Sequence, residues 1–237
     1  MHLIYSKADR VIGWLGEEQA ADNGAKSAFE KLSRYITLRD GNYNAKEIMQ
    51  HYQDPGGTSM PKYPSEWTAI CSILGKRWFS RVWIIQEIVM APHLSLRCGG
   101  IELDRSVIEK TLDFLSSSLL ITLTSLHKAK QALSMIATAR MAISALAESE
   151  PWTLMKVLWV TRSFSASISR DRLFAFLRVI KARHDSFLVP DYKSSNAELY
   201  TRWAAHSLVE EPPFMCLSLA CPSQSLLRES LPTWVPD

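Results

Sequence analysis

Apolar and polar positions follow strand spacing near the start of the chain and helical spacing over most of the rest. Residues 10–16 predict a short buried strand closed by Gly16. A helix is expected next, because its apolar residues recur at helical spacing: Ala28, Phe29, Leu32 and Ile36. Residues 40–64 are rich in Gly, Asn, Tyr and Pro and predict a long irregular loop.

Two helices and a hairpin are expected in the middle of the chain. Ser65 is a plausible N-cap for a helix through Leu74, and Ser80 for a second helix that runs to about residue 91. Residues 94–98 alternate, and two glycines turn the chain into residues 101–103, which predicts a β-hairpin.

The chain after residue 104 has a helical pattern. Apolar residues recur at spacings of four and three from Ile108 to Ile143. This allows a coiled coil, but the serines at 116–118 and an imperfect seam favour two packed amphipathic helices. Further helical patterns lie near residues 152–159, 171–180 and 197–208. Together, these expected elements predict an α+β fold that is predominantly α-helical with a few short strands.

Composition narrows the class of protein. The 237 residues are 47% hydrophobic and carry a net charge of +3, which suits a globular chain and gives no support for nucleic-acid binding through a general electrostatic field. The longest mostly apolar run, residues 119–126, falls well short of the roughly 20 residues of a membrane span. We therefore expect neither nucleic acid nor a membrane span.

The sequence contains no recognisable motif for binding a cofactor or a metal ion. The four cysteines form no CxxC pair, and the six histidines are scattered. Gly-rich phosphate loops, HExxH and GxSxG are also missing. With no signal peptide, the cysteine pattern favours reduced thiols and a cytoplasmic location.

Residues 76–87 are the most unusual segment, because they combine dense apolar residues with basic groups and the carboxylate of Glu87. An unpaired buried charge costs several kcal/mol, on the order of 3–5, so Glu87 needs a partner or a solvated edge. It is either a carboxylate with a raised pKa, available as an acid, base or ribose-binding group, or the structural partner of an arginine. That arginine is Arg77 or Arg81, or one of the more distant group Arg162, Arg170 and Arg172. Asp171 is a candidate helix-start or salt-bridge carboxylate, and Asp191 a candidate for a turn and cap.

Several segments resemble one family in the family's own order. Residues 4–16 resemble the IYSxAxxVxxWLG segment of fungal heterokaryon incompatibility (HET) domains, and residues 77–87 resemble their xxWFxRxWxxQE signature. Residues 98–99, 170–175, 190–192 and 231–237 resemble the family's CG, RDKxYA, PDY and LPSWVPD segments. The signature and structural residues of this resemblance are Trp14, Trp78, Phe79, Arg81, Trp83, Gln86, Asp171, Asp191 and Trp234, and Glu87 is its candidate catalytic residue.

Two motifs of the family's N-terminal half are absent: a Ser-Tyr-x-Trp-Gly segment and a Trp-x-Asp-x-x-Cys-Ile-Asn-Gln motif. The resemblance therefore implies the C-terminal part of a HET domain at residues 1–105 and a helical downstream region at 106–237. It also implies that the strands are the remnant of an α/β domain similar to the TIR fold.

The resemblance implies a part in fungal nonself recognition and regulated cell death. Three alternatives follow: a protein that acts by assembly with itself or with other incompatibility or signalling proteins, a TIR-like effector that cleaves NAD with Glu87, and a truncated, non-functional fragment. NAD enters only as a substrate of the second alternative, and no bound cofactor is expected.

Overall fold

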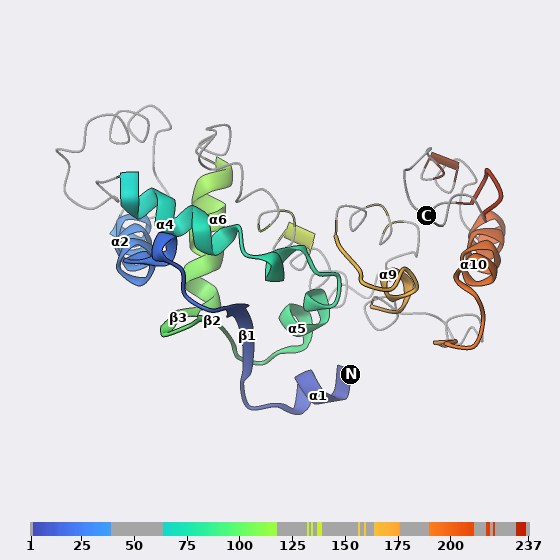
Figure 1. Ribbon diagram of the computed structural model, residues 1–237, viewed down its shortest axis with the longest axis horizontal. Helices are drawn as coiled ribbons and strands as arrows, with labels where there is room; N and C mark the ends of the chain where they lie inside the picture. Colours follow the sequence, from blue (N-terminus) through green and yellow to red (C-terminus); the bar gives the residue numbers. More distant parts are fainter. Residues whose placement is uncertain are drawn as a thin grey trace. The chain divides into compact units, whose positions relative to one another are not determined.

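The computed structural model describes residues 2–38, 64–117, 164–175, 190–210 and 231–235, with isolated positions at 132, 134, 137, 138, 156, 159, 217, 218 and 220. The chain forms two compact units, Met1–Ala139 and Arg140–Asp237. Unit 1 holds the strands and the helices around them, and unit 2 holds two described helices (Figure 1).

A three-stranded sheet organises the described part of unit 1. Its strands are β1 (Val11–Gly16), β2 (Leu94–Cys98) and β3 (Ile101–Asp104), in the order β1-β2-β3. β1 runs parallel to β2, and β2 and β3 form the expected antiparallel hairpin. Side chains of β1 alternate between buried and exposed, as one covered sheet face requires. The predicted strand and hairpin are confirmed, and β1 is an edge strand of the sheet that the described residues form.

Two glycines allow close approaches around this sheet. A Cβ on Gly13 would lie 2.5 Å from Cδ2 of Leu96 and 2.8 Å from Cζ2 of Trp78, so the missing side chain lets an indole ring pack against β1. Gly99 turns the hairpin with a φ of +53°, where a Cβ would lie 2.7 Å from that of Glu18. Gly13 therefore needs glycine for packing, and Gly99 needs it for packing and for its backbone conformation.

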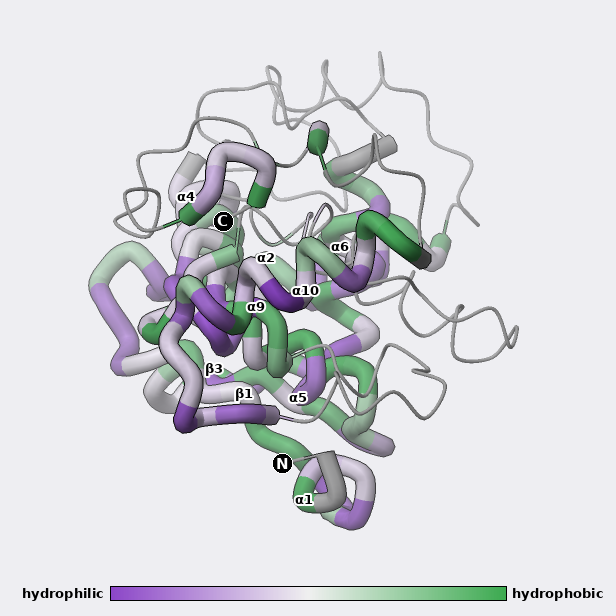
Figure 2. Tube along the Cα trace, turned by 90° about the vertical axis from the view of Figure 1, so that its right-hand side faces the viewer, coloured by the Kyte–Doolittle hydropathy of each residue, from purple (hydrophilic) through white to green (hydrophobic). Residues whose placement is uncertain are grey.

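Helices cover the sheet and form the core of unit 1. These are α2 (Ala25–Leu38), α4 (Pro64–Leu74) and α6 (Arg105–Ser117), which pack together over one side of the sheet (Figure 1). Hydrophobic and hydrophilic positions alternate within the turns of α6 (Figure 2). Phe29, Phe79 and Phe114 are fully buried, and Tyr35 meets Phe114 edge to face at 6.1 Å.

Short elements connect the sheet to these helices. α1 (His2–Lys7) packs against α5 (Ile84–Met90), and the 3₁₀ turns η1 (Ala20–Asp22) and η2 (Arg77–Ser80) lie next to α4 and β1. Ser80 was expected to cap the helix toward residue 91, and this is wrong. Ser80 ends η2 and donates a hydrogen bond to the carbonyl of Arg77, while Trp83 is the N-cap of α5.

Unit 2 contains α9 (Asp171–Phe174) and α10 (Asn196–Glu210) among its described residues. α10 begins with a capping box: Ser195 and Glu198 each accept a hydrogen bond from the other's backbone N–H, at 3.2 and 2.8 Å. The hydroxyl of Tyr200 donates to the carbonyl of Ser169 at 2.8 Å and ties α10 to the segment before α9.

The described chain is thus α+β and predominantly helical, as predicted. Most of the expected loop at 40–64 and of the apolar repeat beyond residue 117 lies outside the described residues. The domain boundary expected at residue 105 stays a prediction; the compact unit itself continues through the hairpin into α6.

Candidate functional site

Glu87 lies in a group of side chains from three elements, which we call the Glu87 cluster: Tyr5 on α1, Trp78 on η2, Arg81 after η2, and Glu87 on α5. Nε1 of Trp78 donates a hydrogen bond to Oε2 of Glu87 at 3.3 Å, and Tyr5 also hydrogen-bonds this carboxylate. Trp78 is held in place by an edge-to-face contact with Phe79 at 5.1 Å. The carboxylate is therefore positioned by aromatic donors.

The surroundings of Glu87 raise the pKa of its carboxyl group. Burial raises the pKa of Glu87, and it outweighs the hydrogen bonds from Trp78 and Tyr5 and the charge of Arg81. The same burial, together with the Glu87 charge, raises the pKa of Tyr5. Arg81 is exposed and acts on Glu87 through its charge, while the hydrogen bonds to Glu87 come from Trp78 and Tyr5.

Replacing Glu87 with Gln should flatten the dependence of stability on pH. Because the folded state raises the pKa of Glu87 above its ordinary 4.5, ionisation destabilises the fold as pH rises from that value toward the folded-state pKa. We expect the free energy of unfolding of Glu87→Gln, relative to wild type, to rise between about pH 4 and pH 7. Urea unfolding at several pH values measures this; a constant difference would show that burial does not shift Glu87.

A second polar group, the Lys76 cluster, consists of Asp22, Ser72, Lys76 and Cys98. Oδ2 of Asp22 accepts hydrogen bonds from Nζ of Lys76 at 2.6 Å, from the N–H of Gln19 at 2.8 Å and from Sγ of Cys98 at 3.5 Å. Asp22 and Cys98 are 0% and 1% exposed, and the Lys76 side chain is 11% exposed. This is a buried ion pair at the junction of η1, α4, η2 and β2.

The partners in the Lys76 cluster overcome the cost of burial. Burial alone would raise the pKa of Asp22, but hydrogen bonds from Lys76, Ser72 and Gln19 lower it below its ordinary range. Burial would lower the pKa of Lys76, and Asp22 and Cys98 raise it. Sequence analysis missed this cluster, because Asp22 is separated from Lys76 by 54 residues and from Cys98 by 76. Only the Cys98-Gly99 match pointed toward it.

The signature tryptophans lie in different environments. Trp78 is buried, Trp83 is half-buried, and Trp14 is 50% exposed on β1 beside Ile12, which is 53% exposed. Phe79 and Gln86 are buried, and Trp234 is half-buried in the C-terminal segment of unit 2. The resemblance therefore includes one aromatic residue, Trp14, that the fold of unit 1 does not bury.

Unit 2 brings the segments of Asp171 and Asp191 together. Arg170, next to Asp171, donates hydrogen bonds to Oδ1 of Asn196 at 3.1 Å and to the carbonyl of Tyr192 at 2.9 Å. Phe174 meets the ring of Tyr192 edge to face at 5.1 Å. The RDKxYA-like and PDY-like segments are thus in direct contact.

Asp191 forms the turn before α10. Hydrogen bonds from the Ser194 hydroxyl and from the N–H groups of Lys193 and Ser194 lower the pKa of Asp191 to about 2. Asp171 begins α9, as expected of a helix-start carboxylate. Both positions organise the fold of unit 2.

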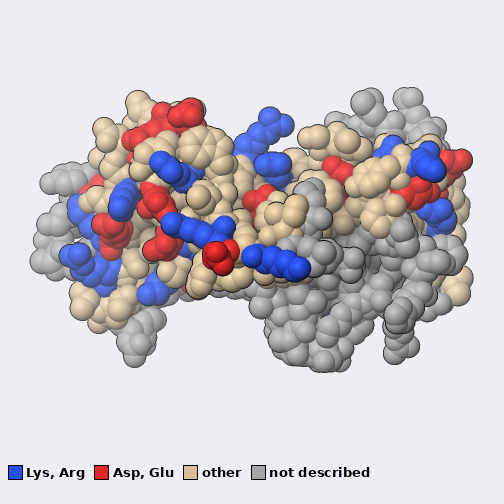
Figure 3. All heavy atoms as spheres, turned by 90° about the horizontal axis from the view of Figure 1, so that it is seen from below, with Lys and Arg blue, Asp and Glu red and all other residues tan. Residues whose placement is uncertain are grey.

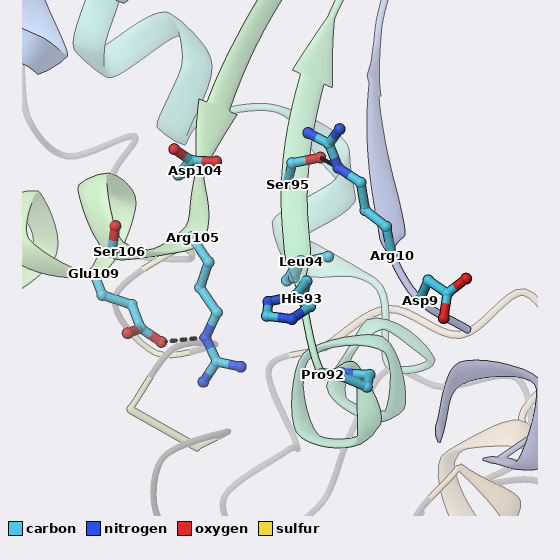
Figure 4. A pocket seen from close by; sticks show the side chains of 10 residues that line it. All are labelled: Asp9, Arg10, Pro92, His93, Leu94, Ser95, Asp104, Arg105, Ser106 and Glu109. Carbon is cyan, nitrogen blue, oxygen red and sulfur yellow. Dashed lines mark hydrogen bonds and ion pairs between the residues drawn. The ribbon is translucent and has the colours of Figure 1, made fainter. Parts of the chain in front are cut away.

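A hollow of about 600 Å³ opens between the start of β1, the start of β2 and the start of α6 (Figure 4). Arg10 in this hollow donates to Ser95 Oγ at 3.2 Å and pairs with Glu102. Arg105 pairs with Glu109 at 2.7 Å and donates to the carbonyl of Ile88 at 2.8 Å. Both guanidinium groups are thus engaged by this chain, and the hollow presents a surface of mixed charge.

Comparison with known proteins bears on the first part of the chain. The family model described as "Heterokaryon incompatibility protein (HET)" matches residues 1–87. Residues 1–87 thus belong to the HET family. This HET segment ends at Glu87 and contains β1, α2, α4 and both tryptophans of the Glu87 signature. Searches of curated proteins and of solved structures found no match.

Three further observations concern the described residues alone. None of their helices combines the length and the apolar character needed to cross a bilayer. Nor do three or more His, Cys, Asp or Glu side chains gather there in an arrangement for a metal ion. On the face shown in Figure 3, acidic and basic side chains of the described residues are interspersed, with no broad patch of one sign.

Proposed function

We propose that this chain is a heterokaryon incompatibility protein that acts in fungal nonself recognition and regulated cell death by assembling with further copies of itself in the cytoplasm. The match of residues 1–87 to the HET family supports the family-level part of this proposal. The observation that supports assembly is the unpaired edge of β1 in the described part of the chain, together with the exposed side chains of Ile12 and Trp14.

The outer edge of β1, the side that faces away from β2, can accept another strand. Within the described residues, β1 pairs only with β2. The N–H of Val11 bonds to the carbonyl of His93, so the peptide groups of Ile12 and Trp14 point to the open edge. An edge strand with exposed apolar side chains is a template for another strand.

A second copy of β1 fits this edge in antiparallel orientation. If Ile12 lies opposite Trp14 of the second copy, the outward peptide groups of these two residues meet as hydrogen-bonded pairs. The same register places Val11 opposite Leu15 of the second copy, so that both β1 strands overlap over most of their length. The exposed apolar stripe of β1, Ile12 and Trp14, thereby pairs with the same stripe of the second copy.

Replacing Ile12 with Thr and Trp14 with Ser should weaken assembly about tenfold or more, because aromatic anchors supply most of the energy of such interfaces. Sedimentation velocity on the full chain measures this. The matched control is Ile4→Thr with Val209→Thr, since these residues are 68% and 81% exposed and belong to α1 and α10. A wild-type chain that stays monomeric at high micromolar concentration would contradict the proposal.

A second candidate function is cleavage of NAD, with Glu87 as the acid or base. The observation that favours it is the raised pKa of a half-buried carboxylate held by Trp78 and Tyr5, since such perturbed groups cluster at catalytic sites. Incubating the assembled wild-type chain with NAD, beside Glu87→Gln, tests it. NAD loss that is equal in both samples, or absent from both, would argue against a catalytic Glu87.

A further inference from the structure

The Lys76 cluster places a nucleophilic nitrogen and a nucleophilic sulfur on the same oxygen atom. Nζ of Lys76 lies 2.6 Å and Sγ of Cys98 lies 3.5 Å from Oδ2 of Asp22. Lys76 and Cys98 also hydrogen-bond each other. The two atoms are therefore neighbours within one buried site.

The surroundings hold both atoms in this arrangement. Sγ of Cys98 lies 3.6 Å from the carbonyl oxygen of Glu17, and Cys98 is 1% exposed. Oδ2 of Asp22 is fixed by the N–H of Gln19. A nitrogen and a sulfur held this way need little movement to become linked.

The site also has an unused buried acceptor. Oδ1 of Asp22 has no hydrogen-bond partner, although Asp22 is 0% exposed. Leaving such an atom unpaired costs about 1–3 kcal/mol, so its position calls for an explanation. A donor of the size of a water molecule would satisfy it.

We propose that Lys76 and Cys98 are an oxidative modification site at which dioxygen links the lysine nitrogen to the cysteine sulfur through a single oxygen atom. The Cys98 thiol, the neutral Lys76 amine and one O₂ give the S–O–N bridge and one water. Sulfur and nitrogen each lose two electrons, and O₂ takes up all four. One oxygen atom enters the bridge, and the other leaves as water with the thiol proton and one amine proton.

The bridge has a structural consequence and a chemical condition. It joins the end of β2 to the segment between α4 and η2, beneath the loop that contains η1. Burial and the Asp22 charge raise the pKa of the Cys98 thiol, and Asp22 also raises the pKa of Lys76. Both groups must lose a proton before they react, so the bridge forms slowly at neutral pH and faster in alkali.

Intact-mass spectrometry of the full chain, kept in oxygen-saturated alkaline buffer, tests the proposal. We expect a gain of about 14 Da, one oxygen gained and two hydrogens lost, that dithiothreitol reverses. Tandem mass spectrometry should find Lys76 and Cys98 in one linked peptide pair. The bridged chain should also unfold at a higher temperature than the reduced chain.

Three variants make the test specific. Lys76→Arg keeps a cation beside Asp22 but removes the amine, and Cys98→Ser removes the sulfur, so neither should gain about 14 Da. Cys71→Ser removes a buried thiol of α4 outside the cluster and should behave as wild type. A gain of about 16 or 32 Da on Cys98 alone, or no gain in the folded wild-type chain, would overturn the proposal.

Discussion

Replacing Lys76 with Met should lower the free energy of unfolding by about 3–5 kcal/mol at neutral pH, because it leaves the Asp22 carboxylate buried without its counter-charge. Asp22 is 0% exposed and one of its oxygens already lacks a partner, so the fold has no other cation with which to compensate in this cluster. Urea unfolding followed by circular dichroism measures the loss.

The sign of the pH dependence follows from the two pKa shifts. The pKa of Asp22 is lowered below its ordinary 3.8, so its stabilising effect is present above that value and is lost as pH falls through the folded-state pKa. The pKa of Lys76 is raised above 10.5, so its effect is present below that value and is lost at higher pH. The pair should therefore stabilise the fold across the whole neutral range.

Two comparisons isolate the buried pair. Adding Asp22→Asn to Lys76→Met removes the stranded charge and should recover a large part of the lost stability, with a coupling of about 1–3 kcal/mol. Lys31→Met is the matched control, because Lys31 pairs with Glu66 while its own side chain is 46% exposed, and it should cost about 1 kcal/mol or less. Equal losses from Lys76→Met and Lys31→Met would contradict this account of the cluster.

Replacing Trp78 with Ala should also cost about 3–5 kcal/mol, because the indole fills the space between η2, β1 and α5. The ring is 4% exposed, packs against Phe79 and lies where a side chain on Gly13 would be. Removing it also removes the donor to Glu87. Chemical unfolding of the full chain measures the change.

Trp14→Ala is the matched control, since the Trp14 side chain is 50% exposed and its removal should cost the monomer about 1 kcal/mol or less. Trp78→Phe separates packing from hydrogen bonding, because it keeps a ring and loses Nε1, and we expect an intermediate loss of about 1–2 kcal/mol. If Trp78→Ala and Trp14→Ala destabilised the chain equally, the assignment of Trp78 to the core would be wrong.

Elements formed by local signals could be predicted from the sequence. The alternation in β1, the two glycines of the hairpin and the spacing of α10 each depend on neighbours along the chain, and each element is present. The break between Ser80 and Trp83 could not be predicted in this way. Next to this break lie the contact of Trp78 with Gly13 and the ion pair of Lys76 with Asp22. Both join residues that are far apart in the sequence, so the local spacing of apolar residues does not reveal them.

The candidate sites show the same division. Glu87 stood out because a carboxylate is rare in so apolar a segment, and its raised pKa agrees with that reading. Its partners did not follow from the sequence: the structural alternative named an arginine, whereas Trp78 and Tyr5 supply the hydrogen bonds. The exposure of Trp14 could not be predicted either, because the alternation of residues in a strand does not show which face of the sheet the rest of the fold leaves uncovered.

The central claim is that this HET protein acts by assembly through β1 and not by catalysis at Glu87. Inducible expression in a filamentous fungus, with hyphal viability scored for wild type, Glu87→Gln and Ile12→Thr/Trp14→Ser at matched protein levels, tests it most directly. We predict that wild type and Glu87→Gln kill the hyphae and that the β1 variant does not. Loss of killing in Glu87→Gln, with the β1 variant still lethal, would contradict the claim.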